Sequence, residues 1–180
     1  TVSDDGKTIT FELRDDVYFH SHEKIGDNRK FNADDVIYTF ELACTKQMGE
    51  DPSSAYTSIF KGILKGADEF YNGETDEIEG LKAEGNKIIM ELESRDVNFI
   101  NKLTQTTASI VSKEMVEEGL ETELVGTGPF LFDKYTEKDQ RVNIILKKNP
   151  MYYGVDEEGN QLPYLDSLVF IIEGRSLLQL

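Results

Sequence analysis

His20 and His22 are the side chains best suited to metal or acid–base chemistry, because the chain contains only these two histidines. They are two residues apart, so on a strand both imidazoles would face the same side, with Glu23 beside them. Imidazole and carboxylate groups are typical zinc ligands. Two imidazoles and one flexible carboxylate are a weak metal signature, however. We expect a structural or solvated pair, no bound metal and no cofactor, with a metal site as the alternative.

Hydrolytic chemistry has few candidate groups. Ser21 and Ser109 are possible nucleophiles, but neither lies in a G-x-S-x-G turn, and a triad would also need a histidine and an acid. The 35 acidic residues leave open a carboxylate pair of the glycosidase kind, since the separation of the two groups in space decides that chemistry. We predict no catalytic residue, and a carboxylate-pair hydrolase is the alternative.

Two glycine-containing segments resemble known binding loops only in part. Residues 126–130, GTGPF, lack the third glycine of a dinucleotide fingerprint and the Gly-Lys-Ser/Thr ending of a P-loop, and Pro129 has no amide hydrogen to donate. Residues 156–160, DEEGN, place glycine at position 4 of a calcium loop instead of position 6, and Ser167 stands where the bidentate Glu belongs. We expect ordinary turns at both places.

These side chains depend on an alternation of short strands and helices. Residues 8–13 alternate apolar and polar as a half-buried strand does, and residues 17–19 are a second short strand candidate. Asn32 is a good helix N-cap, followed by acidic residues in the first turn and by Val36, Phe40 and Cys44 at helical spacing. Cys44 is therefore expected in the core.

The later segments indicate more strands than helices. A helix is expected from residue 53 or 54 towards residue 64, and hairpins over 81–93 and 130–147, the second closed by a polar turn at 137–140. Residues 167–172, SLVFII, are a continuous apolar run typical of a strand buried on both faces. The pattern predicts an α+β fold with a mixed sheet and flanking helices.

Composition narrows the possible partners. The chain has 180 residues, 38% of them hydrophobic, and 35 acidic against 19 basic residues give a net charge of −16. This surface repels phosphate backbones, so we predict no nucleic-acid partner. One cysteine allows no internal disulfide. The first residues have neither a basic nor an apolar leader segment, so we expect no signal peptide here, and if the parent protein is exported its leader lies upstream.

Several ordered motifs resemble one protein family. Residues 3–20, SDDGKTITFELRDDVYFH, are similar to the S-D-G-K-T-Y-T-F-x-L-R-x-G-V-K-F-H-D-G stretch of the family 5 solute-binding proteins, which include oligopeptide, dipeptide and nickel receptors. FNADDVIYTF at 31–40, VGTGPF at 125–130, KNPMYY at 148–153 and PYLDSLVF at 163–170 also resemble family segments. Asp16, Ser21 and Tyr153 depart from the family pattern at single positions.

The resemblance implies part of one lobe of a two-lobed, type II periplasmic-binding-protein-like fold. Residues 1–124 are then a small α+β subdomain of the N-terminal lobe, and 125–180 are truncated strands of the main part of that lobe. The implied function is the substrate-binding component of an ABC importer, located outside the cytoplasmic membrane, in the periplasm or lipid-anchored. It would capture oligopeptides and deliver them to the permease, without being an enzyme.

We expect two ligand-binding residues. Tyr56 resembles a family position that faces the cleft, and Thr127 in the Gly-Thr-Gly-Pro turn is a weaker candidate. Each also has a structural alternative, Tyr56 as a core or surface residue and the Thr127 turn as a device that re-aims a strand. The loop over residues 153–164 resembles family members that take up oligosaccharides, so an oligosaccharide is the alternative ligand. A regulatory domain that has borrowed the fold is a further alternative.

Overall fold

The computed structural model describes residues 1–46, 52–120, 123–138 and 141–173. The elements in chain order are β1 (Thr8–Glu12), α1 (Ala33–Ala43), η1 (Tyr56–Phe60), α2 (Ala67–Tyr71), β2 (Leu81–Glu84), β3 (Lys87–Glu91), α3 (Phe99–Lys102), η2 (Thr106–Ala108), α4 (Lys113–Glu117), β4 (Phe130–Lys138), β5 (Arg141–Lys148) and β6 (Ser167–Glu173). Within these described ranges, no helix has the length and apolar character needed to cross a bilayer. The predicted α+β class is confirmed.

The chain forms two compact units. The first contains Thr1–Asp15 and Phe31–Glu118, and the second contains Asp16–Lys30 together with the chain from Gly119 onward. The division into domains of residues 1–124 and 125–180 stays a prediction. Where one mixed sheet was expected, the described residues form two three-stranded sheets, each antiparallel throughout.

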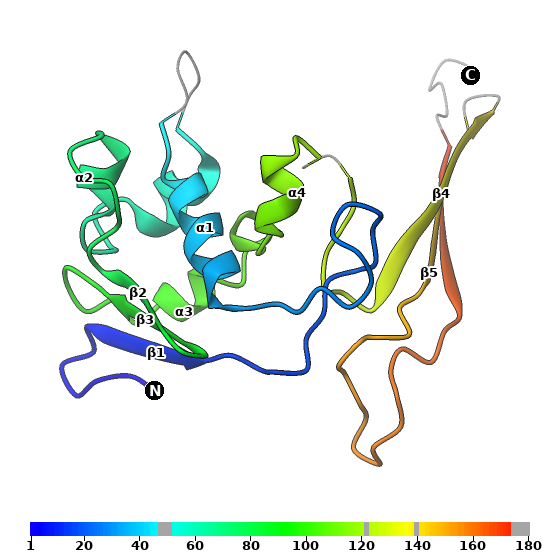
Figure 1. Ribbon diagram of the computed structural model, residues 1–180, viewed down its shortest axis with the longest axis horizontal. Coiled ribbons are helices and arrows are strands. Elements are labelled where there is room, and N and C mark those ends of the chain that lie inside the picture. Colours follow the sequence, from blue (N-terminus) through cyan, green and yellow to red (C-terminus); the bar gives the residue numbers. More distant parts are fainter. Residues whose placement is uncertain (47–51, 121–122, 139–140, 174–180) are drawn as a thin grey trace, which may run out of the picture. The chain divides into compact units, whose positions relative to one another are not determined.

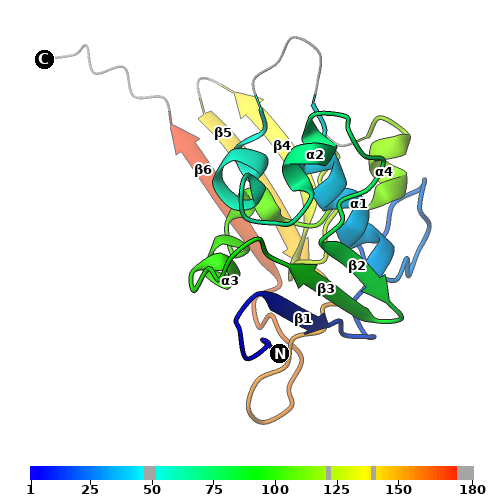
Figure 2. The ribbon, with the colours of Figure 1, turned by 90° about the vertical axis from the view of Figure 1, so that its left-hand side faces the viewer.

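The first unit is a small sheet covered by helices. Its strand order is β1-β3-β2, and α1 packs on β2 and β3 (Figures 1 and 2). Alternation along β3 buries Ile88 and Met90, and in the register Met90 lies opposite both Ile9 and Leu81. These side chains line one face of the sheet and form the floor of the core.

The start of α1 follows its sequence closely. Asn32 Oδ1 accepts hydrogen bonds from the amides of Asp34 and Asp35 at 2.9 and 3.2 Å, and Asp35 Oδ2 accepts one from the Asn32 amide at 2.9 Å. This reciprocal capping box satisfies amides at the helix start that have no partner inside the helix. Cys44 at the other end is fully buried, and burial raises the pKa of its thiol to about 12, so its predicted core position is confirmed.

The helix expected from residue 53 or 54 begins at Ser54 and continues as a π-helix, η1, that ends at Phe60. Ile59 and Phe60 are fully buried, and the ring of Phe60 lies 5.0 Å from that of Phe40. Both side chains belong to the core of the first unit.

Three backbone segments of the first unit cross at Gly80. The Lys65 amide donates to the Glu91 carbonyl at 3.0 Å, the Gly80 amide to the Lys65 carbonyl at 2.8 Å, and the Glu91 amide to the Gly80 carbonyl at 2.8 Å. A Cβ on Gly80 would lie 2.5 Å from the Glu91 carbonyl oxygen. The crossing therefore requires a residue without a side chain.

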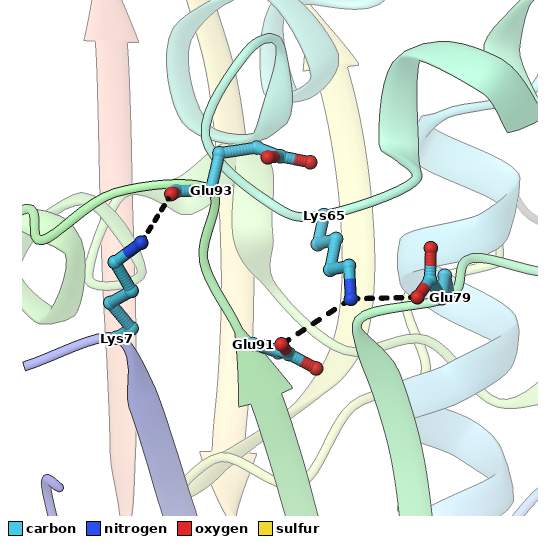
Figure 3. A network of polar contacts seen from close by, with 5 residues as sticks. All are labelled: Lys7, Lys65, Glu79, Glu91 and Glu93. Atoms are coloured by element: carbon cyan, nitrogen blue, oxygen red, sulfur yellow. Dashed lines mark hydrogen bonds and ion pairs between the residues drawn. The ribbon is translucent and has the colours of Figure 1, made fainter.

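Two ion pairs of Lys65 and a hydrogen bond from Lys7 lie near this crossing (Figure 3). Lys65 Nζ lies 2.7 Å from Glu79 Oε1 and 3.4 Å from Glu91 Oε1, while Lys7 Nζ donates to the Glu93 carbonyl at 3.0 Å. The Glu79 side chain is 62% exposed, so these pairs are solvated and contribute little to the free energy of folding. The backbone hydrogen bonds fix the crossing.

The second unit contains the sheet β4-β5-β6. β4 and β5 form the predicted hairpin, with a register shift between Phe132 and Lys134, and β5 pairs along its length with β6. Part of the predicted polar turn, at residues 139–140, lies outside the described residues. The strand expected over residues 17–19 is wrong, because Tyr18 makes only a single bridge, to Lys30.

The strand predicted over residues 167–172 is confirmed as β6, but its predicted burial on both faces is wrong. Val169, Phe170, Ile171 and Ile172 are 51–56% exposed. The physical reason is coverage: among the described residues β6 pairs only with β5, and its side chains lack a packed layer above or below the sheet. An apolar run predicts where burial is favourable, and it cannot supply the covering layer.

Candidate functional site

Several hydrogen bonds hold the turn Gly126–Pro129 in the second unit. His20 holds its first part: the His20 amide donates to the Gly126 carbonyl at 2.7 Å, and the Gly126 amide donates to His20 Nδ1 at 3.3 Å. His20 Nε2 lies 3.0 Å from the Gly128 carbonyl oxygen. One buried side chain thus bridges the two glycines that flank Thr127.

These contacts define the tautomer of His20. Nδ1 accepts a hydrogen bond, so it carries no proton, and Nε2 faces a carbonyl oxygen, so it donates one. A neutral imidazole satisfies both contacts, with neither nitrogen left for a metal ion. His22 is placed differently, since its Nδ1 accepts from the Lys24 amide at 3.3 Å. The described parts of the chain contain no group of three or more His, Cys, Asp or Glu residues arranged to hold a metal.

Asn149 holds the other part of the turn. It is 2% exposed, its Nδ2 donates to the Gly128 carbonyl at 2.8 Å, and its amide donates to the Pro129 carbonyl at 2.8 Å. Its Oδ1 accepts from the Met151 amide at 2.9 Å. The role of Asn149 was not predicted, and the only local signal was the turn-forming Asn-Pro pair at 149–150.

Thr127 lies between the two glycines of this turn. It is half-buried, and within the described part of the chain neither its backbone nor its hydroxyl has a hydrogen-bond partner. Beside the turn is a hollow of about 180 Å³, lined by residues 20–22 and 123–125 and by Leu131 and Phe132. Contact of Thr127 with a ligand stays a prediction.

Tyr56 lies in the core of the first unit. It is 2% exposed, its ring stacks on that of Tyr71 with centroids 4.1 Å apart, and its hydroxyl donates to Asp68 Oδ1 at 2.9 Å. Burial, followed by the bond to Asp68, raises the pKa of Tyr56. Contact of Tyr56 with a ligand also stays a prediction, and the two predicted contact residues belong to different units.

Tyr56→Phe should lower the free energy of unfolding by about 1–2 kcal/mol at neutral pH, because Asp68 loses a buried donor. The pKa of Tyr56 is higher in the folded than in the unfolded protein, where it is near 10. The resulting stabilisation is complete below about pH 10 and is lost as the pH rises from there through the folded pKa. Urea unfolding should therefore show a smaller difference in the free energy of unfolding between wild type and Tyr56→Phe at pH 10.5 than at pH 8. An equal difference at both pH values would contradict this.

Asp156 organises the loop that was expected to be an ordinary turn. Its Oδ1 accepts from the amides of Glu158 and Asn160 at 2.9 and 2.7 Å, and its Oδ2 accepts from the Asn160 side chain at 2.9 Å and from the Tyr164 hydroxyl. These bonds, with that from Tyr164 the largest cause, lower the pKa of Asp156 to about 2. The loop is a closed surface turn stabilised by one carboxylate.

The pKa of Asp156 makes a direct prediction. A lowered folded pKa gives stability that is present above the unfolded value near 4 and is lost as the pH falls through about 2. Side-chain carboxyl NMR titration should place this pKa well below those of exposed aspartates. In Tyr164→Phe the pKa should move upward, because the largest cause of the shift is removed. An unchanged titration curve in that variant would exclude the contact.

Comparison with known proteins agrees with this architecture. Residues 1–176 match the sequence model of the bacterial extracellular solute-binding proteins, family 5, middle part. The chain is 34% identical over 180 residues to Di/tripeptide-binding protein 1 of Pseudomonas aeruginosa. This alignment covers 95% of the chain and 30% of the relative. It is 32% identical over 162 residues to Heme-binding protein A of Haemophilus influenzae, covering 82% of this chain and 27% of the relative.

A solved structure shows the same fold. An ABC transporter-associated periplasmic binding protein from Helicobacter pylori, in complex with the peptide STSA, superposes with a TM-score of 0.70 at 27% identity, over 94% of this chain and 31% of that one. The chain thus spans about a third or less of the length of the relatives it matches. The family match covers almost the whole sequence, and the chain belongs to the bacterial extracellular solute-binding proteins of family 5.

Proposed function

We propose that this chain is part of the substrate-binding component of an ABC importer that captures short peptides outside the membrane and delivers them to the permease. The observation that carries the proposal is the 34% identity, over 95% of the chain, to a protein named for di- and tripeptides. The structure of a relative that holds the peptide STSA supports the same ligand class. Proteins of this kind bind and release their ligand without making or breaking bonds.

The mechanism we propose is ligand-driven closure. A ligand that touches two lobes favours the closed state by its difference in affinity for the closed and open states. Since the chain spans about 30% of its relatives, it supplies only some of the ligand contacts. Thr127 is the favoured contact, because its polar groups have no partner among the described residues. Contact with the Tyr56 hydroxyl would require its bond to Asp68 to open.

The proposed location is outside the cytoplasmic membrane, and the family description, which calls its members extracellular, supports it. A lipid anchor on the parent protein is part of this proposal. The net charge of −16 fits a protein that works without nucleic-acid partners. Neither relative named above is called a sugar-binding protein, so the proposal names peptide and not oligosaccharide.

A thermal-shift screen of the full-length receptor tests the proposal. The ligands are the tetrapeptide STSA, a set of dipeptides, hemin and a linear trisaccharide. A peptide at 100 times its dissociation constant should add about 2.7 kcal/mol to the free energy of unfolding, because it binds only the folded state. If only hemin or the trisaccharide raises the melting temperature, the ligand is heme or an oligosaccharide and not a peptide. Turnover of any ligand would instead support a carboxylate-pair hydrolase.

The 180-residue chain alone should bind the same peptides very weakly, since it carries only part of the proposed cleft. Isothermal titration of this chain should give no dissociation constant below about 100 μM, which corresponds to about 5.5 kcal/mol of binding free energy. A micromolar constant would show that the site lies entirely within these residues.

A further inference from the structure

Gly126 and Gly128 differ from every other glycine that the structure describes. Most of the others have a positive φ, which favours glycine, and the Cβ of an alanine at Gly80 or Gly154 would clash with a neighbour. Gly126 and Gly128 have ordinary φ values, and a Cβ on either would meet no atom within 4 Å. Neither the backbone nor the packing of the described residues therefore requires glycine at these positions.

Glycine is also used where a backbone must approach a ligand closely. Between the two glycines lies Thr127, whose amide, carbonyl and hydroxyl make no hydrogen bond within the described ranges. Thr127 is only half-buried, so these groups are accessible to an external partner. A donor and an acceptor on this half-buried residue match the alternating donors and acceptors of an extended peptide main chain.

Two buried residues hold the backbone of the turn in place by hydrogen bonds. His20 and Asn149 occupy the Gly126 amide and the carbonyls of Gly126, Gly128 and Pro129 through contacts of 2.7–3.3 Å, and both side chains are buried. The backbone groups that bond to His20 and Asn149 are therefore already paired, and the polar groups of Thr127 remain for a ligand. Such preorganisation lowers the entropy cost of binding.

We propose that the Gly126–Thr127–Gly128 turn is a docking surface for the main chain of the bound peptide, kept free of side chains by its glycines, and that His20 and Asn149 are its positioning residues. This rests on the proposed function, because the ligand is the peptide of the receptor. The turn recognises backbone and not side chains, so it contributes affinity for peptides of different sequence.

The test measures peptide affinity and melting temperature separately in the full-length receptor, with STSA and a dipeptide as probes. Gly126→Ala and Gly128→Ala should each leave the melting temperature of the unliganded protein within about 2 °C, since the added Cβ meets no atom within 4 Å. Each should weaken binding of both probes at least tenfold. Thr127→Val, which removes only the hydroxyl, should weaken binding less than the glycine variants.

A positioning role for His20 is tested by a double-mutant cycle. His20→Gln keeps a donor for the Gly128 carbonyl, and it should weaken peptide binding in the wild-type background but by less than twofold when Gly128→Ala is already present. The melting temperature should fall equally in both backgrounds. A role in folding alone would move only the melting temperature. Equal losses of affinity in both backgrounds would remove His20 from the proposal.

Two results would overturn the docking surface while leaving the receptor function intact. The first is wild-type affinity in both glycine variants. The second is a large fall in the melting temperature of the unliganded glycine variants, which would show that other parts of the receptor pack against this turn. If the wild-type receptor binds neither probe, it is the proposed peptide function that fails.

Discussion

Gly80→Ala should destabilise the first unit by about 3 kcal/mol or more, at the upper end of overpacking costs. The added Cβ would lie 2.5 Å from the Glu91 carbonyl oxygen and 2.9 Å from that of Lys65. Both contacts are with backbone, so relief requires the crossing segments to separate. Separation would weaken the hydrogen bonds that the Gly80 amide and carbonyl make at 2.8 Å.

Urea unfolding followed by circular dichroism measures this loss, with Gly126→Ala as the matched control. The chemical change is identical and φ is ordinary at both positions, but a Cβ at Gly126 meets nothing within 4 Å. The control should therefore stay within about 0.5 kcal/mol of wild type, as surface substitutions usually do. Equal stability of the two variants would contradict this prediction, because it would mean that the crossing segments accommodate a Cβ at Gly80 at little cost.

Phe60→Ala is the second large effect, and we expect a loss of about 3–5 kcal/mol in the free energy of unfolding. Phe60 is fully buried at the end of η1, and its ring packs 5.0 Å from that of Phe40. Removing the ring loses its transfer free energy and leaves a cavity that the surrounding helices and sheet fill only in part. The effect is a large share of the total stability of a small domain.

Two further variants give the scale of this loss. Phe60→Leu keeps most of the buried volume and should cost less than half as much as alanine. Ile100→Ala removes a side chain of the same unit that is 45% exposed, so it should cost less than about 1 kcal/mol. Denaturant midpoints with unchanged m-values decide the comparison. A cost at Phe60 no greater than that at Ile100 would show that η1 does not belong to the core.

Sequence reasoning succeeded where the determining interactions are local. The start of α1 depends on Asn32 and Asp35, three residues apart, whose side chains and amides bond each other. The hairpins of β2 with β3 and of β4 with β5 join strands that are neighbours in the chain. Periodicity and capping preferences record such short-range physics directly, so these elements were predictable.

It failed where distant segments decide the outcome. His20 and Asn149 meet at Gly128 although 129 positions of sequence separate them, and neither residue type indicates a clamp by itself. The strand expected at residues 17–19 has only one bridge, because no continuous partner strand lies beside it in the described residues. The bond between the Tyr56 hydroxyl and Asp68 was likewise not predicted, because it depends on how two separate helices pack, while contact of Tyr56 with a ligand stays a prediction.

The arrangement of β6 has a practical consequence for handling the chain. On its far side from β5, β6 has no paired strand among the described residues, and the aliphatic side chains beside that border are solvated. An unprotected apolar border of this type recruits strands from other molecules. The 180-residue polypeptide should therefore self-associate at high concentration. Measurements on it should use dilute samples, and light scattering should check that it stays monomeric.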